Sequence, residues 1–247
     1  MWYPNTDIRS IQLPGLESIG YQTEIRDVES PRIVYDPTGF FIVIRNSSSQ
    51  SVTDILWEKR DWIESHLQRV EDQLDTIGEH PADYQGELYL EGSGYRIERG
   101  VGDYDFSILE QKVYLEAPDA EEHISHLVSK IKEYVRSELN GTARKFTDEL
   151  DVEHPEIHVR NQKTKWGSCS SSGITSFNVR SGGLPKLHFD YLVAHELAHQ
   201  AIPNHGPSFW GTLESVVDAP KKKQKEMAGY WHLINQNDIW QAISLSW

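Results

Sequence analysis

Cysteine is almost missing from this chain of 247 residues, because Cys169 stands alone. A single cysteine excludes an intrachain disulfide and a four-cysteine zinc ribbon, and it favours a reducing compartment. Long apolar runs are missing too, since the longest, Phe40–Ile44, is far too short to cross a bilayer. The first residues, MWYPNTDIRSIQLPG, lack the basic start and apolar run of a secretory signal. We therefore expect a soluble, cytoplasmic protein with no membrane partner.

Basic residues are also in deficit. The chain has 24 Lys and Arg against 38 Asp and Glu, which gives a formal net charge of −14. A protein this acidic repels a phosphate backbone unless its bases gather on one face, so nucleic acid is disfavoured as a partner. In contrast, 38% of the residues are hydrophobic, which is enough for a sizeable core in one large domain or two modest ones.

The first 118 residues are rich in strand-like segments, and no internal repeat is evident. One amphipathic helix is predicted from Val52 to about Leu74, where apolar residues recur at helical spacing. Asp36–Gly39, with the sequence DPTG, predicts a turn between the first two strands, and Gly92–Gly94 predicts the turn of a later hairpin. The predicted strands are Ile19–Asp27, Gly39–Asn46, the two arms of the hairpin in Gly86–Gly100, and Lys112–Pro118.

The second half of the chain combines helices with a few strands. A long helix is predicted after Asp119, and strands at Glu156–Gln162 and Gly173–Arg180 follow it. We expect an α+β fold in which residues 1–118 form a β-rich N-terminal part with one helix and residues 119–247 form the catalytic part. The sheet of the first part can also lie against the second part, in which case the chain is one continuous domain.

The segment AHELAHQAIPNH indicates a metal site. His195 and His199 are four residues apart on a helix predicted between Pro185 and Pro203, so their side chains project from one side, with about 6 Å between Cβ atoms. Both imidazoles can then bind one zinc ion at about 2.0–2.1 Å. The chain bends after Pro203 and presents His205 as a third ligand. Three imidazoles leave a fourth position for water, which is typical of a catalytic site for one Zn²⁺ ion.

Glu196 is the candidate catalytic residue. It lies about 100° round the helix from His195, which is unsuitable for a third ligand but suits a carboxylate that contacts a metal-bound water. Such a carboxylate accepts a proton as hydroxide attacks a carbonyl, and then passes it to the leaving amine. The alternative is an ordinary helix with two exposed histidines, which the helix stop and the third histidine disfavour. Three imidazoles favour zinc over manganese or cobalt.

Five motifs of the second half belong together: Trp166-Gly167-Ser168-Cys169, Asn178, His195–His199, Asn204-His205 and Phe209-Trp210. Through them the segment Val159–Trp210 resembles the YgjP-like metallopeptidase family, formerly a domain of unknown function, within the zincin-like proteases. A weaker likeness extends through most of the chain. The resemblance implies a zincin-like catalytic domain, zinc at His195, His199 and His205, Glu196 as general base, and a peptide or protein substrate. Lys165 stands where the family usually has arginine, and Arg180–Gly183 replaces an apolar stretch.

Three further residues are candidates for supporting the site. Trp166, Ser168 and Asn178 are predicted either to orient a metal ligand or to line a substrate cleft. The hairpin Lys163–Arg180 can receive an extended peptide by strand addition, although a plain sheet strand explains the same pattern. Ordinary packing and hydrogen bonding remain the alternative for all three side chains.

The sequence therefore favours a zinc metallopeptidase that hydrolyses peptide bonds, and it leaves two alternatives open. One is a SprT-like protease that acts on DNA–protein crosslinks, which the charge of −14 disfavours. The other is a non-catalytic binding module that a metal stabilises. The metzincin proteases share the spacing from His195 to His205, but their motif needs glycine where this chain has Ile202. The sequence carries no signal for the oligomeric state or the cleavage preference.

Overall fold

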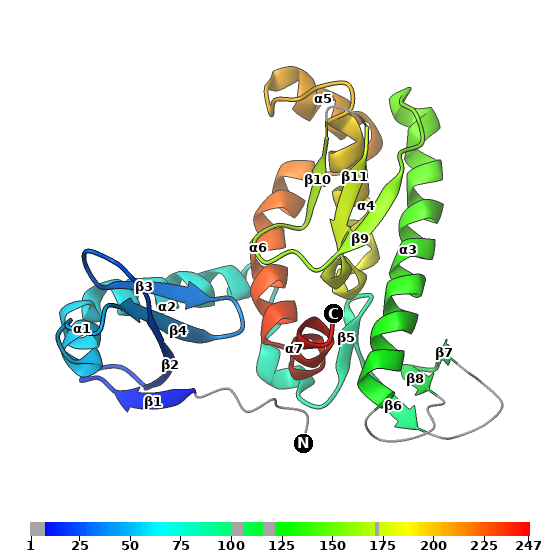
Figure 1. Ribbon diagram of the computed structural model, residues 1–247. Coiled ribbons are helices and arrows are strands. Elements are labelled where there is room, and N and C mark those ends of the chain that lie inside the picture. Colours follow the sequence, from blue (N-terminus) through cyan, green and yellow to red (C-terminus); the bar gives the residue numbers. More distant parts are fainter. Residues whose placement is uncertain (1–7, 100–105, 116–121, 171–172) are drawn as a thin grey trace.

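The computed structural model describes residues 8–99, 106–115, 122–170 and 173–247. Within them the chain forms three β-sheets and seven α-helices, which confirms the predicted α+β class (Figure 1). Two of the sheets have four strands each, and the third has three strands. None of the described helices combines the length and the apolar character needed to cross a membrane.

The two four-stranded sheets share one topology. In each, the first strand pairs antiparallel with the second, the second pairs parallel with the fourth, and the third pairs antiparallel with the fourth. This repeat is visible only in the structure. The first sheet has β1 (Arg9–Gln12), β2 (Ser18–Ile25), β4 (Phe40–Arg45) and β3 (Arg32–Asp36) in that order, and the second has β5 (Leu88–Leu90), β6 (Ser93–Arg99), β8 (Lys112–Leu115) and β7 (Phe106–Leu109).

Three strands lie outside the predicted segments. All three, β1, β3 and β7, are edge strands of their sheets and have few buried residues, so their apolar pattern is weak. The predicted turn at Asp36–Gly39 therefore joins β3 to β4 rather than β2 to β4. The hairpin turn also differs from the prediction. Leu90 pairs with Ser93, so the turn is Glu91-Gly92, and both residues have positive φ (51° and 78°) as a type I′ turn requires.

The predicted helix from Val52 to Leu74 is two helices. Lys59, with φ −99° and ψ 10°, separates α1 (Val52–Glu58) from α2 (Arg60–Asp75). The side chain of Ser51 caps α1 by accepting a hydrogen bond from the backbone of Asp54. The other helices are α3 (Glu122–Leu150), α4 (Lys186–Ala198), α5 (Pro207–Val216), α6 (Pro220–Gln236) and α7 (Asp238–Leu245), with short 3₁₀ segments η1 (Pro81–Tyr84) and η2 (Val179–Gly183).

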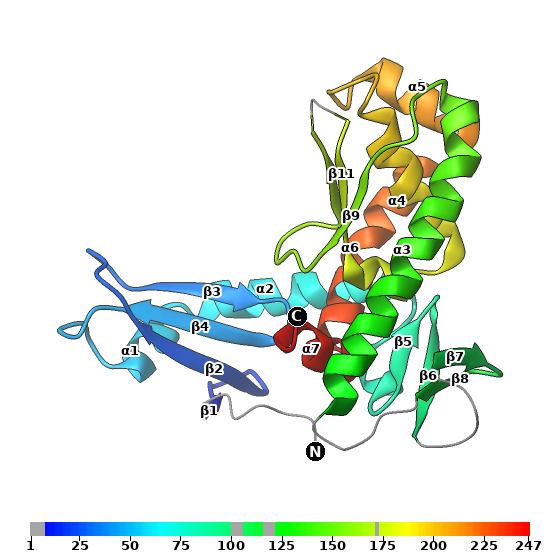
Figure 2. The ribbon, with the colours of Figure 1, turned by 45° about the vertical axis from the view of Figure 1, so that its right-hand side comes forward.

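The third sheet lies beside the helices that carry the histidine motif. Its order is β10 (Gly167–Cys169), β11 (Thr175–Asn178) and β9 (Ile157–Arg160), so β10 is an edge strand. β10 and β11 form the predicted hairpin, and β11 pairs parallel with β9. Figures 1 and 2 show α4 between this sheet, α3 and α6, with α5 across the C-terminal end of α4.

The buried apolar residues form two clusters. The smaller one joins the first sheet to α1 and α2 and includes Leu13, Phe41 and Ile63. The larger one runs from Val70 to Ile243 and combines the second sheet, the third sheet and the remaining helices. The predicted division between residues 118 and 119 falls in 116–121, outside the described part, and it stays a prediction.

Candidate metal centre

Helix α4 carries the first half of the motif through the protein interior. It starts after Pro185, and its side chains are buried on almost every side, as is usual for a helix that runs through a core. The helix ends at Ala198, earlier than predicted, and His199 is its C-cap. The backbone of Ile202 still donates to the carbonyl of Ala198, so a last irregular turn precedes Pro203.

The three histidines converge at the C-terminal end of α4. The ring centroids of His195 and His199 are 4.9 Å apart, and the ring of His205 lies 4.9 Å and 4.7 Å from them. The two Nε2 atoms of His195 and His205 are 3.0 Å apart. In the described part of the chain, this is the one group of three histidine, cysteine or acidic side chains whose ligand atoms all lie within 4.8 Å of one another. The structure thus brings together the three predicted ligands.

The Nδ1 atoms of two of these histidines are held by neighbouring groups. Nδ1 of His199 is 3.1 Å from the carbonyl oxygen of Ile202. A carbonyl only accepts, so Nδ1 carries the proton and Nε2 keeps its lone pair. Nδ1 of His195 is 3.1 Å from the hydroxyl of Tyr191, one helical turn earlier. These partners fix the ring orientations in the way that is usual for metal-binding histidines.

Phe209 of α5 forms an apolar wall against the histidines. Its ring is fully buried and lies 4.7–4.9 Å, between centroids, from all three imidazoles. The neighbouring Trp210 packs against Phe209 and His205. The Phe209-Trp210 pair, which the sequence offers only as part of the family motif, therefore holds the imidazoles in an environment of low polarity.

Burial also keeps two of the imidazoles neutral, those of His195 and His199. It lowers the pKa of His195 to about 3, and the proximity of His199 and His205 adds to this effect. Burial likewise lowers the pKa of His199, although the hydrogen bond to the backbone of Ile202 acts in the opposite direction. A neutral imidazole is the form that binds a metal ion, so neither of these two rings has to release a proton at neutral pH before it binds one.

Glu196 is buried beside the strand β10. Its side chain is 7% exposed, and burial raises the pKa of its carboxyl to about 7, while the charge of Lys165 and a backbone hydrogen bond from Cys169 act in the opposite direction. A Cβ atom at Gly167 would lie 2.7 Å from Oε1 of Glu196. Glycine at position 167 therefore allows the carboxylate to lie against the strand.

The other predicted site residues surround β10 without reaching the histidines. The amide of Asn178 donates to the carbonyls of Gln162 and Lys165, and its oxygen accepts from the backbone of Arg180, so this side chain holds the loop before β10. The indole of Trp166 donates to the carbonyl of Met227 on α6. Ser168 alternates with Gly167 along β10, so its side chain points to the face opposite Glu196.

Tyr191 is the partner that the sequence reading missed. Its spacing of four residues before His195 is a usable signal, because side chains at that spacing meet on a helix. The buried hydroxyl is held by a nitrogen of the histidine, which is a contact that no motif describes.

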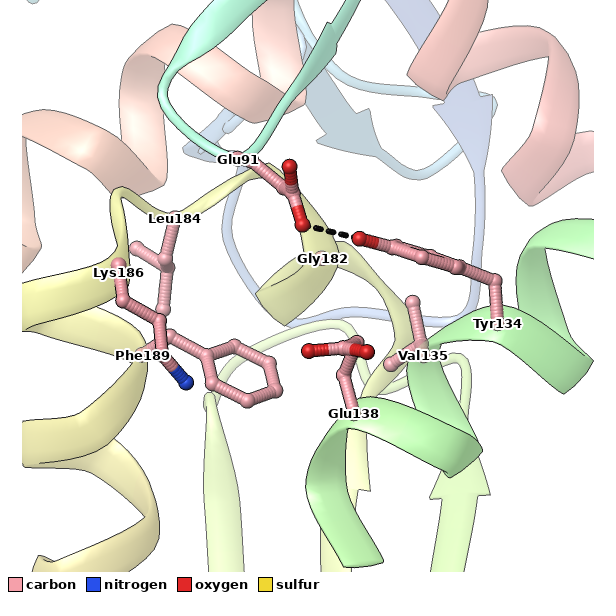
Figure 3. A pocket seen from close by; sticks show the side chains of 8 residues that line it. All are labelled: Glu91, Tyr134, Val135, Glu138, Gly182, Leu184, Lys186 and Phe189. Atoms are coloured by element: carbon pink, nitrogen blue, oxygen red, sulfur yellow. Dashed lines mark hydrogen bonds between the residues drawn. The ribbon is translucent and has the colours of Figure 1, made fainter. Parts of the chain in front are cut away.

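A cavity of about 320 Å³ lies at the opposite end of α4 from the histidines (Figure 3). It contains the carboxylates of Glu91 and Glu138, and Glu91 accepts a hydrogen bond from Tyr134. Lys186, on the same wall, is held by Thr142 and Asp190. The cavity therefore belongs to a different region of the molecule from the histidine cluster.

The donor set of the cluster fits a divalent metal ion of intermediate softness. Neutral imidazole nitrogens are good ligands for zinc, copper, iron and nickel, and hard cations such as magnesium and calcium prefer oxygen. A buried carboxylate beside the cluster and an apolar wall behind it are features of metal-dependent hydrolases.

The comparisons with known proteins define the class as a metallopeptidase. The family described as "YgjP-like, metallopeptidase domain" matches residues 32–230. The chain belongs to the YgjP-like family, as its motifs predict, and membership implies a metal ion and a peptide or protein as substrate.

The other two comparisons add little. No curated protein matches the chain. A crystal structure of the metallopeptidase zymogen of Pyrococcus abyssi abylysin is 23% identical over 35% of this chain and 87% of that one, with a TM-score of 0.33. At that TM-score the likeness supports no argument about fold or function.

Proposed function

We propose that this chain is a zinc metallopeptidase of zincin-like type, in which His195, His199 and His205 hold one Zn²⁺ ion and Glu196 moves the proton. The observation that carries the proposal is the convergence of three imidazoles beside a buried glutamate. The orientation of His199 by the carbonyl of Ile202 leaves Nε2 as the free ligand atom. A bound zinc ion supplies a Lewis acid that polarises the scissile carbonyl and makes water acidic.

The carboxylate of Glu196 takes a proton from the attacking water and delivers it to the amide nitrogen that leaves. The backbone hydrogen bond from Cys169 and the absent side chain at Gly167 hold the carboxylate in one place against β10. Phe209 excludes water from the far side of the imidazoles, which strengthens every charge interaction within the site.

The outer edge of β10 offers a place for the substrate. Trp166 and Ser170 use their backbone groups to pair with Asn178 and Ile174 of the neighbouring strand region. In an antiparallel ladder the intervening residues, Gly167 and Cys169, direct their backbone groups to the opposite edge, where the N–H of Cys169 already donates to Glu196. An extended peptide can add there as a further strand beside Glu196. We therefore expect a peptide or unfolded protein segment as the substrate.

The Glu196→Gln variant tests the proposal. The amide keeps the shape of the side chain but cannot take a proton, so cleavage of a peptide library should fall by about 10²–10⁴-fold while metal content and melting temperature stay close to the parent values. Glu214→Gln, on an exposed part of α5, is the matched control and should leave cleavage unchanged. Undiminished cleavage by Glu196→Gln would exclude the proposed role of this residue. Absence of chelator-sensitive cleavage in the parent protein would favour a non-catalytic metal-stabilised module.

A further inference from the structure

A second cavity of about 310 Å³ lies between the first sheet and the C-terminal helices. Residues of the β3–β4 turn, the segment after β9, η2 and α7 line it. Figure 1 places α7 and α5 at opposite ends of the third sheet, so this cavity and the histidine cluster lie at opposite ends of that sheet. Nothing in the proposed peptidase chemistry uses it.

Arg180 is the unusual residue of this cavity. Its side chain is 6% exposed, and among the described residues it forms no ion pair within 4 Å. Its Nη1 donates to Oδ1 of Asn161 at 2.7 Å, and its buried Nε has no acceptor. Buried charges in proteins are normally paired, because leaving a buried ion without a partner costs several kcal/mol. The stability of the fold therefore does not explain an unpaired arginine in the wall of this cavity.

The guanidinium stays charged and is held in place. Burial lowers its pKa to about 10, and the charge of Asp36 acts in the opposite direction, so Arg180 is a cation at neutral pH. Oδ1 of Asp36 accepts from the backbone and hydroxyl of Thr38 instead of from Arg180. Asn161 orients the guanidinium, and the amide of Asn161 is itself fixed by the carbonyl of Ser244.

The remaining lining supplies charges of both signs. Lys163 lies exposed at the cavity and adds a second cation. Asp36 and Asp238 add two acids, so the wall carries two positive and two negative groups. Phe40, Ala242 and Leu245 form an apolar part of the same wall. A ligand with a carboxylate, an ammonium group and an apolar side chain matches all three kinds of surface, whereas a multiply charged anion would meet the acids.

We infer that this cavity binds a free amino acid or a very short peptide, with its carboxylate on Arg180 and Lys163 and its ammonium group toward Asp36 and Asp238. An oriented guanidinium is the group best suited to bind a carboxylate, since two of its N–H groups can donate in parallel. The inference is independent of the proposed peptidase activity.

Calorimetric titration of the full chain tests the inference, with L-leucine as the probe. The protein is first dialysed against a chelator, so that leucine finds no metal ion at the histidines. Leucine should bind, leucinamide, which lacks the carboxylate, should bind at least about 10-fold more weakly, and 4-methylpentanoate, which lacks the ammonium group, should also bind more weakly. Absence of binding by leucine and by dileucine at 50 mM, or equal binding of leucine and leucinamide, would overturn the inference.

The Arg180→Met variant locates the site. Leucine binding should fall at least about 10-fold, while the ligand-free variant should melt at the same temperature or higher, because a buried unpaired charge has been replaced by an apolar side chain. Leucine binding as tight as in the parent protein would contradict the assignment. Lys163→Gln, at an exposed position, should weaken binding without affecting folding, and Lys225→Gln on α6 removes the same charge outside the cavity and should have no effect.

Discussion

The hydroxyl of Tyr191 lies 3.1 Å from Nδ1 of His195, one turn away on the same helix. A tyrosine in this position fixes the imidazole so that Nε2 points toward the other two histidines. In the Tyr191→Phe variant the ring loses this partner, while the buried apolar surface is retained. Zinc affinity, measured by competition with a chromophoric chelator, should fall about 10–100-fold.

Tyr230→Phe is the control for this measurement. Tyr230 is also buried and contacts a different histidine, His188, by ring packing. Removing its hydroxyl should leave zinc affinity unchanged. A Tyr191→Phe protein that binds zinc as tightly as the parent would show that the helix backbone alone orients His195.

Gly167→Ala should impair turnover without removing the metal. The new Cβ would lie 2.7 Å from Oε1 of Glu196, so the carboxylate must move away from β10. We expect kcat to fall at least about 10-fold, since small displacements of a catalytic group are costly, while zinc content is preserved. Gly211→Ala on α5 is the control, because no atom lies within 4 Å of its added Cβ. Unchanged kcat in Gly167→Ala would argue against the position assigned to the carboxylate.

Removal of the metal should destabilise the protein. The histidines come from the end of α4 and the following loop, so a shared ion ties these segments together. A ligand present at about 1,000 times its Kd stabilises the folded state by about 4 kcal/mol, and a chelator should therefore lower the melting temperature by several degrees. Added zinc should restore it. The His205→Ala variant lacks an exposed ligand, so the chelator should not change its melting temperature. A chelator that lowered the melting temperature of this variant as much as that of the parent would indicate a metal ion bound elsewhere.

Acid should weaken the contact between α2 and α6. Burial lowers the pKa of His232 to about 4, and the nearby His66 adds to this effect. A group whose folded pKa lies below the unfolded value of about 6.5 contributes stability above pH 6.5, and this stability is lost as the pH falls toward 4. Nε2 of His232 is 2.9 Å from Oε1 of Gln73 on α2, and a glutamine can make the same hydrogen bond.

The His232→Gln variant checks this sign. In metal-free protein, the loss of unfolding free energy between pH 6.5 and 4.5 should be smaller in His232→Gln than in the parent, by on the order of 1 kcal/mol. The variant His154→Gln, at an exposed position, is the control, and its unfolding free energy should depend on pH as that of the parent does. An identical pH dependence in His232→Gln and the parent would mean that this histidine is not the group that senses acid.

Local rules account for what the sequence predicts well. The spacing of His195 and His199 fixes their relative direction on any α-helix, and Pro203 ends the helix wherever the rest of the chain lies. The contacts of Tyr191, Gly167 and Phe209 depend on side-chain rotamers and on packing between elements distant in sequence. Residue spacing alone gives no access to those distances.

The sheets show the same limit. The edge strands β1, β3 and β7 are short and half-exposed, so their pattern resembles that of loops. The shared topology of the first two sheets rests on parallel pairing of β2 with β4 and of β6 with β8, which joins segments that are not neighbours in the chain. Arg180 shows the limit at a single residue, because the burial of its Nε without an acceptor is a property of its surroundings.

The central claim is that three imidazoles hold one catalytic zinc ion, and the metal content of tag-free protein tests it most directly. After incubation with zinc and removal of the excess, elemental analysis should find one zinc per chain in the parent and in Glu196→Gln, and less than a tenth of that in His205→Ala. Zinc at trace level in the parent, or a full equivalent in His205→Ala, would contradict the account.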